Sequence, residues 1–405
     1  MYKLFALRYF KAKKSTNAIN IISWVSVTAI AVGAAAMVLV LSVYNGFEDL
    51  VKSLYSSFYP EIKVAPVSGK TLFISDEQLK KIAATPGVAV YSKVAEEKAA
   101  VINGDYQTIV SIKGVDENYT KVTGVADKII RGKFDLGTAD EPLAILGSGV
   151  EGLLGVNSAT SIYQLTTYIP RKAVESKDPR ASLPQGNILP AGTFAIQQDF
   201  DNKYIITNLA FIKKQIGLQD DEYSAIEIKV KPEESISSIK KELISLLGNA
   251  YKVEDRYEQN RTLYNVMQLE KWVIFGILSL ILIIAAFNMI GALTMLVLEK
   301  KKDIQVLQAM GADKSFIKKV LLSEGVLLAS IGAFSGMLLA VIFCLLQQQF
   351  HFIPLAGNSF VIDYYPVKVL PLDLVVIALT IFIVAILASW IPATKASNQP
   401  FELKV

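Results

Sequence analysis

The pattern of apolar positions along the chain predicts four membrane-spanning helices. The first apolar segment, Ser15 to Phe47, contains no Asp, Glu, Lys, Arg or His. Three more segments that are uncharged or nearly so follow late in the chain, at Trp272–Leu298, Val320–Phe350 and Leu374–Thr394. A helix needs about 20 apolar residues to cross the hydrocarbon core, and each segment is long enough. We expect spans at 18–45, 272–298, 320–346 and 374–394.

A cleaved signal peptide is the alternative interpretation of the first apolar segment, because a basic stretch precedes it. Ala34, Ala35 and Ala36 resemble a small-residue cleavage site. Cleavage there would leave the apolar octet Met37–Tyr44 as a new N-terminus. The length of the segment favours a membrane span instead.

The long insert between the first and second spans, 46–271, is predicted to fold as an α+β domain. Short strand patterns alternate with helical patterns, and no apolar run is long enough to re-enter the membrane. Ser75-Asp-Glu-Gln78 is a capping box that predicts the start of a helix, and Thr85-Pro86-Gly87 predicts its end. The predicted fold class is a membrane protein with four transmembrane α-helices and a large extracytoplasmic α+β domain inserted between helices 1 and 2.

A short repeat indicates how the insert is divided. The tetrapeptide EIKV occurs at Glu61–Val64 and again at Glu227–Val230, and each copy leads into a helical pattern, the second at Glu233–Leu247. A four-residue match can also arise by chance. If the repeat is real, two strand-helix-strand units form one subdomain and the middle of the insert forms a β-rich one. The first subdomain then comprises about 58–112 and 209–260, and the second about 113–208.

A proline-rich segment, Pro170–Pro190, interrupts the β-rich middle. Proline lacks the N–H donor and constrains the residue before it, so we expect neither a helix nor a central strand here. Two interpretations remain open, a surface loop and a projecting arm that binds a partner protein. The residues that represent the arm are Pro170, Arg171, Pro179, Pro184 and Pro190.

Composition supports a mixed architecture and weighs against several kinds of chemistry. The 405 residues are 52% hydrophobic and 19% charged with a mean hydropathy of +0.40, which is too apolar for an ordinary soluble protein and too charged for a pure membrane bundle. With one cysteine, Cys344, and one histidine, His351, the chain cannot by itself assemble a metal site of His and Cys ligands or a His-based triad. We therefore expect no metal site and no enzyme activity in this chain.

The net charge of +4 is small and lies beside the predicted spans, so it indicates membrane orientation and not a surface for nucleic acid. Lysine and arginine in short flanking segments stay on the cytoplasmic side. The tail 1–17 carries five of them, the loop 299–319 carries six lysines, and the connection 347–373 carries only Lys368. We expect both termini (1–17 and 395–405) and the loop 299–319 to be cytoplasmic, and the insert and the connection 347–373 to lie on the other side of the membrane.

The cytoplasmic loop is predicted to contain a short amphipathic helix. Ile304, Leu307 and Met310 recur at helical spacing, and Gly311 can end the helix. Two interpretations remain open. The helix could lie on anionic lipid through its lysines, or it could be a knob that sits in a groove of a cytoplasmic partner.

A partial nucleotide-binding motif occurs at Ser68-Gly69-Lys70-Thr71. The complete phosphate-binding loop requires a glycine where Val64 stands, because a flexible backbone there cradles the phosphates. We therefore expect no cofactor to bind this chain, and any ATP that drives it must bind a separate subunit.

Small residues four positions apart occur in two of the spans, as Ala29-x-x-x-Gly33 in the first and Gly332-x-x-x-Gly336 in the third. Such pairs let two helices approach closely. We expect them to pack against other helices, within this chain or in a dimer.

Three stretches together resemble one family, the permease subunits of lipoprotein-releasing (Lol) ABC transporters within the MacB/FtsX-type superfamily. Ser42-Val-Tyr-Asn-Gly-Phe-Glu48 is similar to the end of the first span of these permeases, although the family more often has Met where Tyr44 stands. Glu299–Gly325 resembles the coupling helix and the start of the third span, and Pro392–Lys404 resembles the closing proline-alanine signature. The insert resembles the family only in its layout.

The resemblance implies an assembly as well as a fold. It implies a dimer with a second permease, the same or homologous, and a periplasmic domain with a porter-like part and a β-rich part. It also implies two copies of a cytoplasmic ABC ATPase, which supplies ATP hydrolysis and contacts Ile304, Val306, Leu307, Met310 and Gly311. One permease type of the family carries a hook for a periplasmic lipoprotein carrier where Pro170–Pro190 lies, without a residue-by-residue match.

The leading hypothesis is a permease subunit that extracts lipoproteins from the inner membrane and passes them to a periplasmic carrier. Acyl chains need an apolar cavity during extraction, since each buried CH₂ contributes about 0.8 kcal/mol. We expect the outer ends of the first two spans to line this cavity, through Val40, Val43, Tyr44, Phe47, Met267, Val273 and Phe275. The alternatives are an FtsX-like signalling protein that activates a cell-wall hydrolase and a MacB-like efflux permease. The sequence is compatible with a homodimer and with a heterodimer.

Overall fold

The computed structural model describes residues 17–172, 183–355 and 362–398, which belong to two compact units. The helical unit contains the chain up to Leu50 and from Asn265 onward, and the α/β unit contains Val51–Tyr264. The basic tail 1–16 and the end of the chain from residue 399, on which part of the predicted orientation depends, lie outside the described residues.

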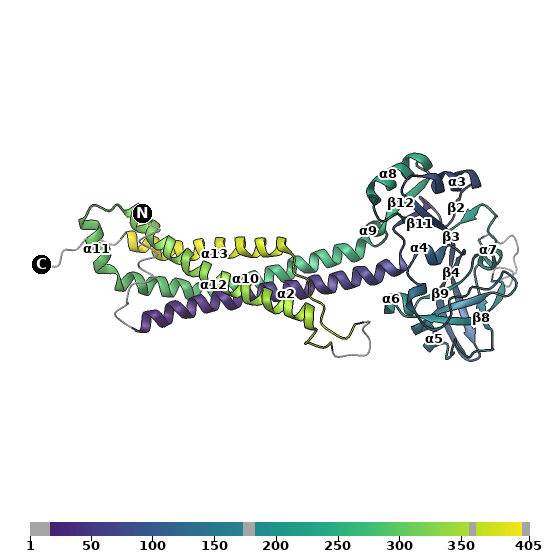
Figure 1. The fold of residues 1–405 in the computed structure, drawn as a ribbon, viewed down its shortest axis with the longest axis horizontal. Helices are drawn as coiled ribbons and strands as arrows, with labels where there is room; N and C mark the ends of the chain where they lie inside the picture. The colour runs from purple at the N-terminus through teal and green to yellow at the C-terminus, as the bar shows by residue number, and fades with distance from the viewer. Residues whose placement is uncertain (1–16, 173–182, 356–361, 399–405) are drawn as a thin grey trace. The chain divides into compact units, whose positions relative to one another are not determined.

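Four long helices form the helical unit (Figure 1). They are α2 (Asn17–Phe58), α10 (Arg261–Glu299), α12 (Lys314–Phe350) and α13 (Pro371–Ser397). All four are long and apolar enough to cross a membrane, so the prediction of four spanning helices with a large insert after the first is confirmed. A short helix, α11 (Lys301–Ala309), lies between α10 and α12 in the chain.

The core of the helical unit runs along all four long helices and includes Met37, Leu282, Leu328 and Ile377. Glycines bring α12 close to α2. A Cβ added at Gly332 would lie 2.6 Å from the Val27 carbonyl oxygen, and one at Gly336 would overlap the Ala31 carbonyl oxygen. The expected close helix approach is therefore confirmed for this pair of glycines, and it takes place within the chain.

The α/β unit is built on one mixed sheet with the strand order β12-β1-β11-β3-β4-β9-β6-β8-β5, and β7 pairs with β3 and β8 (Figure 1). The strands of this sheet are β1 (Ile62–Pro66), β3 (Val88–Asn103), β4 (Tyr106–Val115), β5 (Ile129–Gly132), β6 (Leu143–Gly147), β7 (Leu165–Tyr168), β8 (Gln185–Phe194), β9 (Tyr204–Asn208), β11 (Ala225–Val230) and β12 (Tyr251–Asp255). A separate two-stranded sheet pairs β2 (Leu72–Phe73) with β10 (Glu222–Tyr223).

Helices connect and cover these strands. They are α3 (Asp76–Ala84), α4 (Tyr119–Val122), α5 (Ser148–Leu153), α6 (Gln198–Asp201), α7 (Leu209–Ile216), α8 (Ile236–Leu247) and α9 (Arg256–Gln259). The predicted capping box at the start of α3 is confirmed, because the Ser75 side chain accepts from the Gln78 N–H and the Gln78 side chain accepts from the Ser75 N–H. The helix after the second EIKV copy begins at Ile236, later than the predicted Glu233.

The two EIKV copies lie on adjacent antiparallel strands, with Lys63 opposite Glu227 and Ile62 opposite Ile228. The units β1-α3-β3 and β11-α8-β12 interlock, because β1 lies between β11 and β12 and β11 lies between β1 and β3. This is the strand order of a split βαβ, ferredoxin-like half. Its core combines residues from both ends of the insert, such as Val64, Ile82, Ile228 and Leu243.

The expectation that Pro170–Pro190 contains no strand is wrong for its last part. Gln185 begins β8, and Pro190 is buried inside this strand. The pairing of β8 with β6 shifts register beside the Ala144–Pro190 pair, so the proline lies at a bulge. A bulge tolerates a residue without an N–H donor, and this local irregularity explains the difference.

Candidate functional site

A strap crosses α2 near Ser42–Asp49. We define the strap as the described residues 362–370, which precede α13. The Lys368 N–H donates to the Ser42 carbonyl oxygen at 2.8 Å, and a Cβ at Gly46 would overlap the Pro366 carbonyl. The ring of Tyr365 meets the ring of Phe47 edge-on with centroids 6.0 Å apart. The sequence motif Ser42–Glu48 is therefore a docking strip for the strap.

A polar cluster ties three helices together beside the strap. We call Asn45, Lys271 and Asp373 the clasp; they belong to α2, α10 and α13. Asp373 Oδ2 accepts from Asn45 Nδ2 at 2.6 Å and from Lys271 Nζ at 3.0 Å. Asn45 is only 3% exposed, and its Oδ1 has no hydrogen-bond partner among the described residues. Burial makes each of these polar contacts matter for how the helices pack.

Most of the α2 residues predicted to line an apolar cavity face away from the strap, whereas Phe47 also contacts the strap through Tyr365. At 100° per residue, Val40, Val43, Tyr44 and Phe47 share one helical face, whereas Ser42, Asn45, Gly46 and Asp49 share the opposite one. The Tyr44 hydroxyl of α2 donates a hydrogen bond to the carbonyl oxygen of Met267 in α10. Val40 and Val273 are 41% and 52% exposed, and Phe275 packs edge-on against Trp272. The single chain thus leaves this face partly open.

The predicted coupling residues separate into inward and outward ones. Ile304 of α11 is buried with Val297, Ile317, Leu321, Ala393 and Ala396, which belong to α10, α12 and α13. Val306 and Met310 are 59% and 79% exposed, and Leu307 is half-buried. Gly311 has a φ of +91°, and nothing lies within 4 Å of the position of its missing Cβ.

Ile304, Leu307 and Met310 do not form the single face that their spacing predicts. The last helical residue of α11 is Ala309, so Met310 lies beyond the helix and turns outward. α11 is therefore anchored by Ile304 and presents Val306 and Met310 to its surroundings.

The predicted partner-binding arm is fastened to the α/β unit at its base. Pro170 and Arg171 are exposed, Pro184 is half-buried and Pro190 belongs to the core strand β8, while Pro179 lies outside the described residues. Next to the arm, the Lys172 N–H donates to the Ile216 carbonyl oxygen at 3.0 Å.

The side chain of Lys172 reinforces this base by an ion pair with the buried carboxylate of Glu222. The Thr71 hydroxyl donates to the same carboxylate. Burial raises the pKa of Glu222, but the hydrogen bonds from Lys172 and Thr71 more than offset burial and hold this pKa below its ordinary value. The base of the arm therefore depends on an ionised Glu222.

The end of α2 is embedded in the α/β unit. Phe58 is 1% exposed and stacks on Phe200 with centroids 4.4 Å apart. The ammonium of Lys113 lies 4.9 Å from the centre of the Phe58 ring and pairs with Glu227 Oε1 at 2.7 Å. The Tyr55 hydroxyl donates to Asp199 at 2.6 Å. A movement of this helix end must move the sheet with it, because the contacts are buried and directional.

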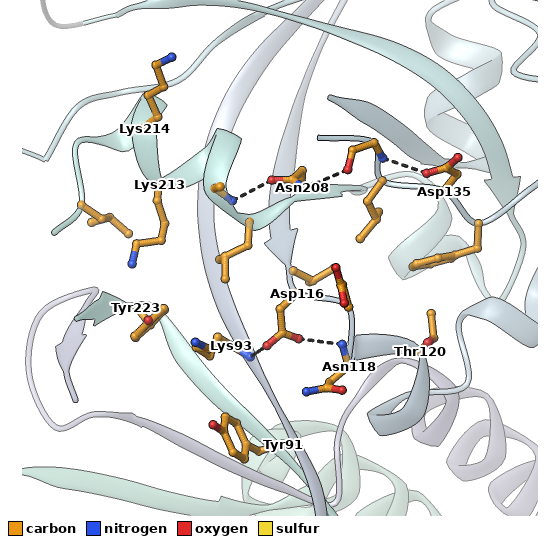
Figure 2. A pocket seen from close by; sticks show the side chains of 18 of the residues that line it. Tyr91, Lys93, Asp116, Asn118, Thr120, Asp135, Asn208, Lys213, Lys214 and Tyr223 are labelled. Carbon is orange, nitrogen blue, oxygen red and sulfur yellow. Dashed lines mark hydrogen bonds between the residues drawn. The ribbon is translucent and has the colours of Figure 1, made fainter. Parts of the chain in front are cut away.

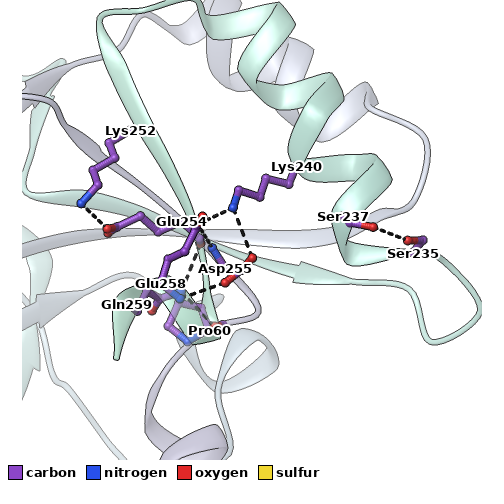
Figure 3. Close-up of polar contacts among 9 residues, drawn as sticks. All are labelled: Pro60, Ser235, Ser237, Lys240, Lys252, Glu254, Asp255, Glu258 and Gln259. Carbon is purple, nitrogen blue, oxygen red and sulfur yellow. Dashed lines mark hydrogen bonds and ion pairs between the residues drawn. The ribbon is translucent and has the colours of Figure 1, made fainter. Parts of the chain in front are cut away.

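Polar contacts also connect the residues after α2 to α9, which precedes α10 in the chain. Figure 3 shows Lys240 of α8 between the carboxylates of Asp255 and Glu258, which together cap α9. Gln259 donates to the Pro60 carbonyl oxygen at 3.3 Å, and Arg256 Nε donates to the Tyr59 carbonyl oxygen at 3.2 Å. The residues just after α2 and just before α10 are therefore held in one rigid arrangement within the α/β unit.

A polar pocket of about 1060 Å³ opens between the two halves of the α/β unit (Figure 2). The Lys213 ammonium lies 4.0 Å from the centre of the Tyr223 ring and donates to the Asp220 carbonyl oxygen at 2.7 Å. Asp116 accepts hydrogen bonds from the Ser92 hydroxyl and the Lys93 N–H, so its carboxylate stabilises the packing against β3. Burial lowers the pKa of Lys213. Within the described residues, no group of three or more His, Cys, Asp or Glu side chains could hold a metal ion.

Sequence reasoning did not identify the strap, the clasp or the buried joint around Lys113. Ser42 and Lys368 meet across more than 300 positions, and the Lys113–Glu227 pair joins strands β4 and β11. A signal in hindsight is the polar residue Asn45, since a buried amide beside an apolar span must find a partner.

Two family models match the chain. The model described as the FtsX-like permease C-terminal domain matches residues 275–401, and the model of the MacB-like periplasmic core domain matches residues 23–170. Between them they include parts of both units.

Curated relatives match over nearly the whole chain. The lipoprotein-releasing system transmembrane protein LolC of Neisseria meningitidis serogroup B is 26% identical, over 98% of this chain and 97% of that protein. The transmembrane protein LolE of the same kind of system in Haemophilus influenzae is 23% identical, again over 98% of this chain and 97% of that protein. Similarity at this length covers the spans and the insert in one alignment.

A solved structure is similar as well. The periplasmic region of MacB from Actinobacillus actinomycetemcomitans aligns with a TM-score of 0.36 and 11% identity, over 54% of this chain and 98% of that one.

Proposed function

We propose that this chain, which belongs to the FtsX-like permeases with a MacB-like periplasmic core domain, is the membrane subunit of an ABC transporter that extracts lipoproteins from the inner membrane. The observation that carries the proposal is the similarity to lipoprotein-releasing permeases over 98% of the chain. The extracted lipoprotein is passed to a periplasmic carrier. The alternatives share the fold: an FtsX-like activator of a cell-wall hydrolase would transport nothing, and a MacB-like efflux permease would transport a different cargo.

The proposed assembly contains a second permease and two copies of a cytoplasmic ATPase. Relatives named LolC and LolE support a second permease, the same or homologous. Exposed Val306 on α11 and Met310 just after it are apolar side chains that a partner groove would cover, which favours an ATPase contact. The lysines of 299–319 support a cytoplasmic position for α11 and for both termini.

The proposed mechanism is mechanical. ATP-driven closure of the ATPases moves α11, and Ile304 passes the movement to α10, α12 and α13 because it packs against all three. Buried contacts at Phe58 and Lys113 pass a movement of α2 to the sheet of the α/β unit. This chain contributes packing and no chemical step.

The cavity for the acyl chains is proposed at the outer ends of α2 and α10. The partly open face of Val40, Val43, Tyr44 and Phe47, together with Val273, supports this position, because exposed apolar side chains at a helix pair can receive an alkyl chain. The second permease would supply the opposite wall. The arm at Pro170, Arg171 and Pro184 is proposed as the contact for the carrier.

The test is ATP-dependent release from vesicles. The chain is purified with its ATPase, reconstituted with a triacylated lipoprotein and supplied with a soluble carrier. We expect ATP to transfer lipoprotein to the carrier, and Val273→Asp to reduce the transfer at least tenfold. Val67→Asp is the matched control, since Val67 is also exposed but lies in the α/β unit. Normal transfer by Val273→Asp would contradict the cavity, and purification with a hydrolase and no lipoprotein would favour signalling.

A further inference from the structure

The strap is held by both of its neighbouring helices. Gln347 of α12 donates through Nε2 to the carbonyl oxygens of Ile353 and Tyr365, both at 3.2 Å, and Gln348 donates to the Val367 carbonyl oxygen at 2.6 Å. At the other side, the Lys368 ammonium reaches Asp49 of α2 at 2.5 Å. The strap therefore bridges the outer ends of α12 and α2.

The clasp joins the same end of α2 to two more helices. Asp373 receives hydrogen bonds from Asn45 and Lys271, so one carboxylate connects α2, α10 and α13. The Asn45 amide also donates to the Lys368 carbonyl oxygen at 3.4 Å, which links the clasp to the strap. Helices α2 and α10 cannot separate at this end while these contacts last.

The arrangement of the strap and the clasp in this structure also contains a buried hydrogen-bond acceptor without a donor. Asn45 Oδ1 is buried and has no hydrogen-bond partner among the described residues. A buried acceptor without a donor destabilises the state that buries it. The clasp thus combines directional contacts with one unfavourable buried group, as expected of an arrangement that opens and closes.

We propose that the strap and the clasp form a latch that holds the outer ends of α2, α10 and α13 together and must release before a lipid-anchored substrate can pass between α2 and α10. The nature of the substrate rests on the proposed function, whereas the latch itself rests on the contacts of Asn45, Lys271, Asp373 and Lys368. Asn45, Lys271 and Asp373 are positioning residues, since they act through the helices that they connect.

The first experiment measures the latch without any substrate. Hydrogen exchange of the strap is followed by mass spectrometry in the complete transporter in phospholipid nanodiscs. Asp373→Leu removes the shared carboxylate, and we expect at least tenfold faster exchange at the amides of Tyr365 and Lys368. Asp363→Asn is the matched control, because Asp363 is an exposed strap acid outside the clasp. Equal exchange in the two variants would overturn the latch.

A charge swap separates positioning from general damage. Lys271→Asp combined with Asp373→Lys restores an ion pair, and the new ammonium can donate to Asn45 Oδ1. We expect the swap to return strap exchange to within threefold of the wild-type rate and to restore its response to ATP. In the wild-type complex ATP should accelerate strap exchange, and a strap that ignores ATP would overturn the proposal.

A reversible lock tests whether opening is required for transport. Asp49→Cys and Lys368→Cys are combined with Cys344→Ala, and a short reducible thiol cross-linker joins the strap to α2. We expect the lock to abolish ATP-dependent lipoprotein transfer and a reductant to restore it. Equal transfer by locked and reduced protein would overturn the latch. If the reduced protein transfers no lipoprotein while ATP still accelerates strap exchange, the proposed cargo fails and the latch stands.

Discussion

At the scale of single residues, the α/β unit depends on charges that are buried and paired. Lys113 and Glu227 are each 3% exposed and come from strands on opposite sides of β3. Burial lowers the pKa of Lys113, but the charge of Glu227 more than offsets burial, so this pKa lies above its ordinary value. A lysine whose pKa is raised in the folded state stabilises the fold fully when the pH is below its ordinary pKa. This stabilisation is lost only when the pH rises through the raised pKa. Lys113 is therefore charged at every working pH.

Removing one partner of this pair should cost far more than removing both. We expect Lys113→Met to destabilise the α/β unit by about 3–5 kcal/mol, because Glu227 is then left buried without its partner. The double variant Lys113→Met with Glu227→Leu should recover most of the loss. Urea unfolding of the full chain in detergent, followed by pulse proteolysis of Val51–Tyr264, measures both. Equal destabilisation by the two variants would contradict this account.

Acid should loosen the base of the arm. The pKa of Glu222 is held below its ordinary value. The stability that its ionised carboxylate contributes is therefore fully present above about pH 4.3, the pKa expected in the unfolded chain. This stability is lost as the pH falls through the lower pKa of the folded state. We expect hydrogen exchange at the Lys172 amide, corrected for its intrinsic rate, to accelerate below pH 4. In Glu222→Gln this amide should exchange faster at neutral pH and respond less to acid. A Glu222→Gln variant with the wild-type pH profile would rule out this anchor.

At the scale of elements, local patterns were predictable and long-range contacts were not. The four spans follow from apolar runs, and the start of α3 follows from Ser75 and Gln78, because these signals lie within a few residues. The strand at Gln185–Phe194 could not be predicted, since Pro190 is accommodated only by a bulge opposite β6. The outward position of Met310 depends on where α11 ends, and helix ends are weakly encoded.

The contact of α12 with α2 should be sensitive to a single methyl group. A Cβ at Gly336 would overlap the Ala31 carbonyl oxygen, so we expect Gly336→Ala to destabilise the helical unit by about 1–3 kcal/mol. Gly291→Ala is the matched control, because nothing lies within 4 Å of its added Cβ. Thermal unfolding in detergent, read by circular dichroism, compares the two. Indistinguishable curves would mean that the helices can shift apart without cost.

At the scale of the whole molecule, the predicted site residues have different roles in the structure. Ile304 packs inside the helical unit and Val306 points outward, although both were grouped as coupling residues. Tyr44 contacts α10, whereas Pro190 lies in the core of the α/β unit. Resemblance locates a functional segment, but the role of each side chain depends on packing partners that are far away in the chain.

Substitutions of the exposed Val306 and of the buried Ile304 should therefore have different effects on coupling to the ATPase. We expect Val306→Asp to weaken ATPase binding at least tenfold, which corresponds to about 1.4 kcal/mol of binding free energy. The same change should leave the stability of the helical unit unchanged, because Val306 is exposed. Ile304→Ala should instead lower stability by about 2–5 kcal/mol, because Ile304 is buried. Affinity measured by surface plasmon resonance and thermal unfolding separate the two effects. Full ATPase affinity in Val306→Asp would exclude this face as the contact.

The long strand β3 has a consequence for how the α/β unit can be divided. Val88–Asn103 pairs with β11 at its beginning and with β7 towards its end, and β4 follows it along most of its length. Either half expressed alone would present a row of unpaired backbone amides, which invites aggregation. Fragments, fusions and domain exchanges in this protein should therefore keep both halves together and place their junctions outside β3 and β4.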